Sequence, residues 1–115
     1  MIRLTIKTIP PSLNQHQRSH WAEKKRLRQN YQWELTQQFM AQAAPFPNPE
    51  SKMRVRISIY RKRLLDPDNL CVKSLLDAMR DVKLIRDDSL KWITLKVEQF
   101  KDIDNPRVEI ELEEE

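Results

Sequence analysis

The chain has 115 residues, a length typical of one domain, and we expect a single domain over residues 1–115. Charged residues make up 33% and hydrophobic residues 39%, which favours a folded globular protein over a disordered one. No apolar run approaches the roughly 20 residues that span a bilayer, so we expect no membrane segment. The single cysteine, Cys71, excludes an internal disulfide framework and favours a cytoplasmic protein.

Charge is distributed unevenly along the chain. The net charge of +4 divides into +10 for residues 1–63, with 13 Lys+Arg against 3 Asp+Glu, and −6 for residues 64–115, with 8 against 14. A basic half suggests a polyanionic partner, because Lys and Arg neutralise phosphates and release counterions. From charge alone, an ordinary solvated surface is the simpler explanation.

The first half of the chain predicts a strand and a long helix. Residues 2–7 alternate apolar and polar, which is the pattern of a strand with one buried face, and Pro10 and Pro11 end it. Residues 19–44 are rich in helix formers and lack proline. Their apolar residues recur every four positions, at Leu27, Tyr31, Leu35 and Phe39. The prolines at 45, 47 and 49 predict a stiff connection after this helix.

The second half predicts a strand at 53–60, a short helix at 70–80 and strands at 93–97 and 108–112. The segment "DIDNP" between the last two strands reads as a turn, which predicts an antiparallel C-terminal hairpin. The fold class is therefore α+β: a two-layer mixed sheet covered by helices, in the order β-α-β-α-β-β.

Two absences limit the possible chemistry. The chain contains no glycine, which excludes the glycine-rich phosphate loops, so we expect no nucleotide cofactor. One cysteine and two histidines, His16 and His20, do not complete a zinc site in a monomer. The two histidines are expected in a loop or at a helix start.

Carboxylates gather around the short helix. Asp66 and Asp68 flank Pro67 before it, and Asp87 and Asp88 precede the next strand. One explanation is that these acids cap helices or form turns. The other is a Mg²⁺ site, because hard divalent ions prefer oxygen ligands and relieve the repulsion between neighbouring carboxylates. The metal site requires that the sheet bring Asp88 beside Asp66 and Asp68.

Lys73 lies among these acids, four residues after Asn69 and four before Asp77. A helix ion pair with Asp77 is the structural explanation of the lysine. The functional explanation is that its ammonium stabilises phosphate charge in a transition state. With a metal ion and a basic surface, that arrangement favours phosphodiester hydrolysis.

Several stretches of the sequence resemble a known family. The stretch "DPDNLCVKSLLDAM", the later "DD" before a strand, and the N-terminal "IPPSLNQHQRSHW" are similar to the RusA family of Holliday junction resolvases, which are of prophage origin. The resemblance implies a homodimeric, Mg²⁺-dependent endodeoxyribonuclease, with Mn²⁺ as a substitute ion, that cuts four-way junction DNA by paired symmetric cuts in recombination and repair. It also implies a protein encoded by a bacterium or a phage.

The resemblance assigns roles by position. Asp66, Asp68 and Asp88 match the metal-binding and catalytic acids, and Lys73 matches the catalytic lysine. Leu65 stands where we expect an arginine, so Arg61, Lys62 or Arg63 would supply that charge. The expected DNA contacts are Asn14, Arg18, Lys24, Lys25, Arg28, Arg54, Arg61, Lys62, Arg63 and Asn69. The basic residues of the long helix and of the strand and loop at 54–63 are expected on one DNA-binding surface.

Two other functions stay open from the residues alone. One is a metal-dependent nuclease on flaps or other branched DNA. The other is a non-catalytic nucleic-acid-binding module whose acids are only caps.

Overall fold

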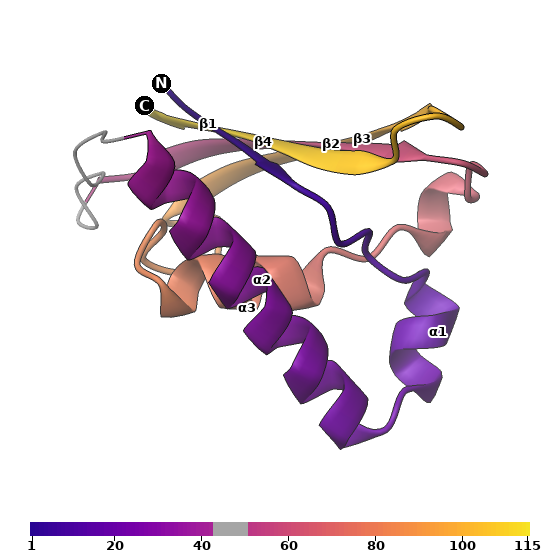
Figure 1. The fold of residues 1–115 in the computed structure, drawn as a ribbon. Helices are drawn as coiled ribbons and strands as arrows, with labels where there is room; N and C mark the ends of the chain where they lie inside the picture. The colour runs from indigo at the N-terminus through magenta and orange to yellow at the C-terminus, as the bar shows by residue number, and fades with distance from the viewer. Residues whose placement is uncertain (43–50) are drawn as a thin grey trace.

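The computed structural model describes residues 1–42 and 51–115, which form a four-stranded sheet with helices packed over one face (Figure 1). In chain order the elements are β1 (Ile2–Ile6), α1 (Leu13–Arg18), α2 (Trp21–Ala41), β2 (Met53–Arg61), a 3-10 turn η1 (Pro67–Asn69), α3 (Lys73–Asp81), β3 (Ile93–Lys101) and β4 (Arg107–Glu114). The expected α+β class with a mixed sheet is confirmed. The expected proline connection at 45–49 lies outside the described residues.

The strand order in the sheet is β1-β4-β2-β3. β4 lies antiparallel to both β1 and β2, whereas β3 lies parallel to β2. The predicted C-terminal hairpin is therefore wrong, because β3 and β4 lie on opposite sides of β2. The cause is the crossover through α3: it returns the chain to the same end of the sheet, so β3 pairs in parallel with β2.

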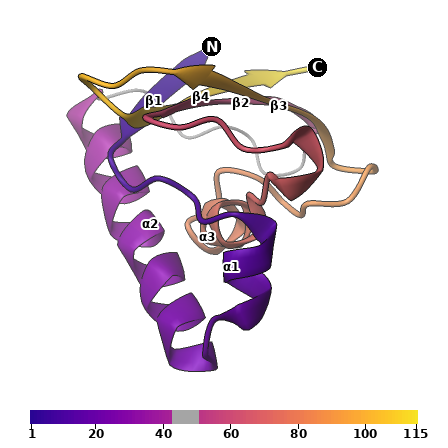
Figure 2. The same ribbon diagram turned by 90° about the vertical axis from the view of Figure 1, so that its right-hand side faces the viewer.

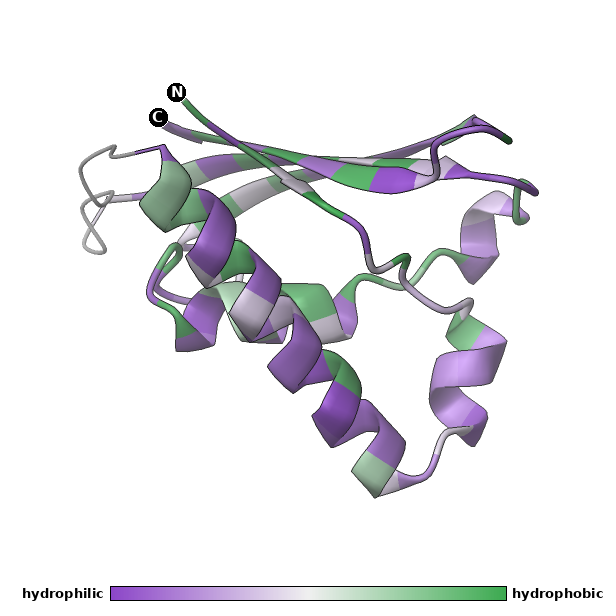
Figure 3. Ribbon diagram, in the orientation of Figure 1, coloured by the Kyte–Doolittle hydropathy of each residue, from purple (hydrophilic) through white to green (hydrophobic). Residues whose placement is uncertain are grey.

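Alternation along β2 separates the two faces of the sheet. Met53, Val55, Ile57 and Ile59 are buried toward the helices, together with apolar residues of β1 and β4. The residues between them point to the other face, which the described helices leave open (Figure 2). Figure 3 shows the same alternation of hydrophobic and hydrophilic residues along the strands.

The helical segment before β2 contains one helix more than predicted: α2 lies within the predicted range 19–44, and α1 precedes it. Ser12 and Gln15 form a capping box that begins α1. The chain then leaves helical geometry at Ser19, and the His20 side chain accepts a hydrogen bond from the Ala22 N–H to begin α2. A helix-start position for His20 is thus confirmed, whereas His16 lies within α1.

The apolar stripe of α2 packs as predicted. Tyr31, Leu35 and Phe39 are buried against the sheet and α3, and Leu27 is partly buried. Among the described helices, none is long and apolar enough to cross a lipid bilayer.

Candidate nucleic-acid interface and acidic turns

The DPDN turn lies between β2 and α3. Asp66 has extended geometry (φ −62°, ψ 144°), as the following proline requires, and its carbonyl accepts a hydrogen bond from the Asn69 N–H at 2.9 Å. The side chain of Gln99 in β3 bonds both backbone groups of Leu65, which fixes the start of the turn against the sheet. The turn is therefore a defined structure that presents its side chains outward.

The capping explanation for the first two acids is wrong. The helix α3 begins at Lys73, later than the expected Leu70, and its N-cap is Val72. Asp66 and Asp68 are exposed, and neither carboxylate forms a hydrogen bond or ion pair with a described residue. Asp66 lies at the N-cap position of η1 and Asp68 in its first turn, but neither side chain makes a capping hydrogen bond.

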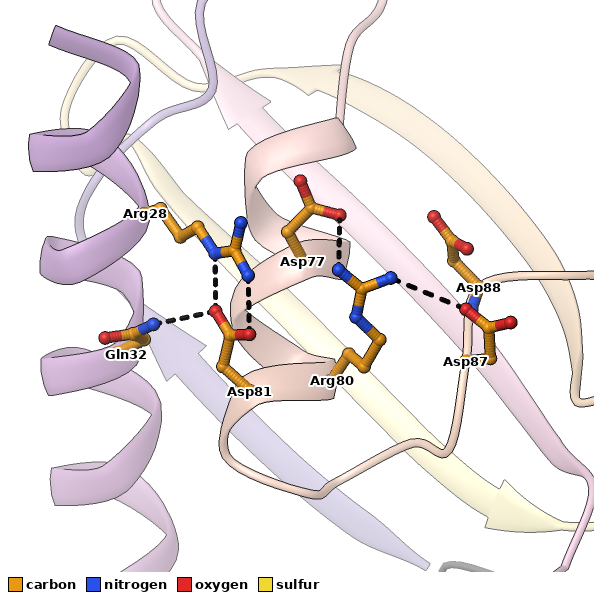
Figure 4. A network of polar contacts seen from close by, with 7 residues as sticks. All are labelled: Arg28, Gln32, Asp77, Arg80, Asp81, Asp87 and Asp88. Atoms are coloured by element: carbon orange, nitrogen blue, oxygen red, sulfur yellow. Dashed lines mark hydrogen bonds and ion pairs between the residues drawn. The ribbon is translucent and has the colours of Figure 1, made fainter. Parts of the chain in front are cut away.

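The later acids lie beside the end of α3 (Figure 4). Arg80 lies between Asp77 and Asp87, at 3.7 Å and 3.6 Å from their carboxylates. Asp87 also accepts a hydrogen bond from the Asp88 N–H at 2.8 Å, which holds the pKa of the Asp87 carboxyl below its ordinary value. Asp87 is thus occupied in a turn, whereas Asp88 is exposed.

The structure does not gather the three predicted metal ligands. Within residues 1–42 and 51–115, no group of three or more His, Cys, Asp or Glu side chains is close enough to hold a metal ion. The donor chemistry of Asp66, Asp68 and Asp88 suits Mg²⁺, which prefers carboxylate oxygens, but their arrangement here is not a metal site.

A basic groove of about 340 Å³ lies between the three helices. Its walls are His16 from α1, Trp21, Lys24, Lys25 and Arg28 from α2, and Lys73, Ser74 and Asp77 from α3. Four cations thus face one carboxylate. Burial lowers the pKa of His16, and the nearby Lys24 and Lys73 lower it further, which keeps the imidazole neutral near pH 7. The groove can attract an anion such as a DNA phosphate.

Lys73 faces this groove and is exposed. The explanation of Lys73 as one half of a helix ion pair is wrong, because its ammonium pairs with no described residue and Asp77 pairs instead with Arg80.

Arg28 is held in place at the groove wall. Its guanidinium donates two hydrogen bonds to Asp81 of α3, at 2.5 and 2.6 Å, and Gln32 donates a third to the same carboxylate at 2.7 Å. These bonds lower the pKa of Asp81, with the bond from Arg28 as the largest cause. The two helices therefore form one rigid wall.

Two of the ten expected DNA contacts lie in unsuitable places. Arg61 is buried, and its guanidinium donates to the Pro10 carbonyl at 2.9 Å. The prediction that Arg61 replaces the missing arginine is therefore wrong. Lys62 and Arg63, which are exposed just after β2, remain as candidates for that charge. Arg54 lies on the open face of the sheet, where it pairs with Glu113 at 3.4 Å. The expected single surface joining Arg54 with α2 is wrong, because the sheet separates them (Figure 2).

The other expected contacts share the helical side with the groove. Asn14 and Arg18 are exposed on α1, and the Asn14 N–H donates to the Asn69 side-chain oxygen at 3.1 Å, which ties α1 to the DPDN turn. The participation of His16 and Trp21 was missed from the sequence. Their place in the groove depends on the packing of α1 and α2 against α3, and α1 was not predicted.

The chain was compared with known proteins. The family model of the endodeoxyribonuclease RusA matches residues 8–113. This range includes the DPDN turn, Lys73, Asp88 and every residue of the groove. No curated protein sequence matches the chain.

Proposed function

The chain belongs to the RusA family of endodeoxyribonucleases, Holliday junction resolvases that hydrolyse DNA, and we propose that it resolves four-way junctions by paired, symmetric, Mg²⁺-dependent cuts in recombination and repair. The observation that carries the proposal is the pair of exposed carboxylates in the DPDN turn, which make no cap and no ion pair with a described residue. Exposed and without a partner, these two carboxylates are available as oxygen ligands of a divalent ion.

Asp66, Asp68 and Asp88 carry the oxygen donors that would hold the ion, with their carboxylates closer together than in the described arrangement. Bound Mg²⁺ would polarise the phosphoryl group and activate water as the nucleophile. The protein's own contribution is to hold the DNA backbone. Exposed Lys62 and Arg63 precede the DPDN turn in the chain, and the groove cations lie on α2 and α3. Asn14 and Asn69 connect these two regions through their hydrogen bond.

Lys73 would stabilise the negative charge that develops on the transferring phosphate. Its support is chemical: the ammonium is exposed, is not neutralised by a described carboxylate, and lies on the first turn of α3, four residues after Asn69. A preorganised cation of this kind stabilises the transition state more than the ground state.

The test is incubation of the purified protein with a synthetic four-way junction, with Mg²⁺ or with EDTA. Flap and plain duplex DNA of the same sequence serve as comparisons. We expect paired cuts on opposing strands of the junction only when Mg²⁺ is present. Faster cleavage of flaps than of junctions would favour the other branched-DNA nuclease, and binding without any cleavage would favour the non-catalytic module.

The substrate also favours a dimer. A four-way junction has two-fold symmetry and needs two cuts, whereas one chain carries one DPDN turn. A C₂ homodimer would present two equivalent sites to symmetry-related strands.

A further inference from the structure

An exposed tryptophan stands at the mouth of the basic groove. Trp21 is 69% exposed and lines the groove with Lys24, Lys25 and Arg28, which follow it on one face of α2. Its ring lies 5.4 Å from that of His20, at a tilt of 40°. Single exposed apolar side chains are common on protein surfaces, so exposure alone gives Trp21 no role. What distinguishes Trp21 is its place in the lining of the groove, beside three cations of the same helix.

We propose that the groove binds an unpaired nucleotide of DNA, with its phosphate against Lys24 and Lys25 and its base stacked on Trp21. This inference rests on the proposed function, since the branch point of a junction is where base pairs lose a stacking neighbour and open most easily. In this proposal, Trp21 is the residue that makes the groove bind unpaired DNA more tightly than duplex DNA.

The chemistry of the groove fits this ligand. Proteins that bind single strands combine cations along the backbone with aromatic rings on which bases stack, and each base offers such a face. Arg28 is already paired with Asp81, whereas Lys24, Lys25 and Lys73 form no ion pair with a described residue. The one carboxylate among the lining residues, Asp77, is itself paired with Arg80. The volume of about 340 Å³ lies within the range of about 300–1,000 Å³ found for small-ligand sites.

A duplex would not use the indole in this way. In B-form DNA the faces of the bases are covered by their neighbours, so only phosphates and groove edges reach a protein surface. Lysines and arginines alone would serve phosphate contacts. The ring of Trp21 adds a contact that only an unstacked base can complete.

Trp33 provides a matched control. It lies on the same helix and is 67% exposed, but it is not part of the groove. A general effect of losing a surface indole should therefore appear equally in Trp21→Ala and Trp33→Ala.

The experiment measures binding of the full chain, in EDTA, to an oligo(dT) strand and to an abasic strand of equal length. The two probes share their phosphates and differ in their bases. We expect Trp21→Ala to weaken oligo(dT) binding about 5- to 150-fold, the range for loss of one base–aromatic stack. Binding to the abasic strand should stay within about twofold, Trp21→Phe should recover most of the affinity, and Trp33→Ala should match wild type.

A direct readout uses the variant Trp33→Phe, Trp92→Phe, in which Trp21 is the one remaining tryptophan. Its fluorescence should be quenched by oligo(dT) and not by the abasic strand. Equal losses in Trp21→Ala and Trp33→Ala, or equal losses on both probes, would overturn the proposal. Because no cleavage is measured, a protein that stacks bases yet cuts no junction would contradict only the proposed function.

Discussion

Arg28 of α2 and Asp81 of α3 form a two-point contact, with both guanidinium bonds between 2.5 and 2.6 Å, that joins residues 53 positions apart. Parallel paired bonds of this kind fix an arginine in direction as well as in distance. The contact neutralises Arg28 at the groove wall and leaves Lys24, Lys25 and Lys73 as the groove cations without an ion pair to a described residue. It therefore connects the packing of the helices with the shape of the proposed DNA site.

Replacing Asp81 by Asn should lower the free energy of unfolding by about 0.5–1 kcal/mol, since a partly exposed pair contributes no more than this. The sign of the pH dependence follows from the lowered pKa of Asp81. The contribution is present above the unfolded pKa near 3.8 and is lost as pH falls below it through the folded pKa. Denaturant unfolding at pH 7 and near pH 2 measures this: wild type and variant should differ only at pH 7.

The control is Asp104→Asn, an exposed turn carboxylate whose side chain pairs with no described residue. It should not change stability at either pH. A difference between Asp81→Asn and wild type that persists unchanged near pH 2 would count against the ion pair as its cause.

Each of the variants Asp66→Asn, Asp68→Asn and Asp88→Asn should reduce junction cleavage by more than about 100-fold, because even second-layer partners of a metal contribute 10- to 100-fold. Junction binding in EDTA should persist, since the groove cations remain. Cleavage and gel-shift assays on the same preparations measure both. Wild-type cleavage in any one variant would remove that residue from the proposed ligand set.

Asp87→Asn should be milder than Asp88→Asn. The Asp87 carboxylate already serves the turn, through the Asp88 N–H and Arg80, so its loss affects local structure first. We expect less than a tenfold loss of cleavage and a slightly lower melting temperature. A complete loss of cleavage in Asp87→Asn, with full cleavage in Asp88→Asn, would mean that Asp87 and not Asp88 is the metal ligand.

Lys73→Ala should reduce the rate more than the affinity. Removal of one preorganised charge donor typically lowers turnover by about 10²–10³-fold. Lys24, Lys25 and Arg28 still hold the phosphate, so junction affinity should fall only a few-fold. Single-turnover cleavage, together with binding in EDTA, separates the two effects. A large loss of affinity with an unchanged single-turnover rate would make Lys73 a binding residue only.

The sequence predicts local geometry here better than contacts between distant segments. Apolar–polar alternation predicted the strands, and the apolar residues at every fourth position predicted the buried face of α2. Both patterns arise because one face of each element is buried, which places apolar residues at the repeat of the strand or the helix. The hairpin prediction failed because it took neighbours in sequence as neighbours in the sheet, whereas the crossover through α3 places β3 beyond β2.

The candidate site shows the same limit. The extended geometry of Asp66 follows from Pro67 alone, a local steric effect. The exposure of Lys73 to the groove depends on how α1, α2 and α3 meet, which no local pattern encodes. Arg61 looked like its exposed neighbours in the run "RKR" although alternation along β2 turns it inward.

Tyr31→Phe should leave the protein as stable as wild type or up to about 1 kcal/mol more stable. The Tyr31 hydroxyl is fully buried, burial raises its pKa, and it has no hydrogen-bond partner in the described part of the chain. A buried polar group without a partner destabilises the fold by about 1–3 kcal/mol. Thermal unfolding measures the change, with Tyr60→Phe on the open face as the control. A loss above about 1 kcal/mol would mean that the hydroxyl is satisfied in solution.

The last prediction concerns assembly. We expect a homodimer in solution at micromolar concentration, free and on junction DNA, with both DPDN turns directed to one DNA-binding side. The groove and the DPDN turn lie on the helical side of the sheet (Figure 1), so a two-fold axis that sets two helical sides toward one junction presents both together. Sedimentation of the free chain and of its complex measures the stoichiometry, and one chain per junction at saturation would contradict it. Mixing wild type with Asp68→Asn adds a functional check, because a dimer with one inactive site should nick one strand of the junction without completing the paired cut.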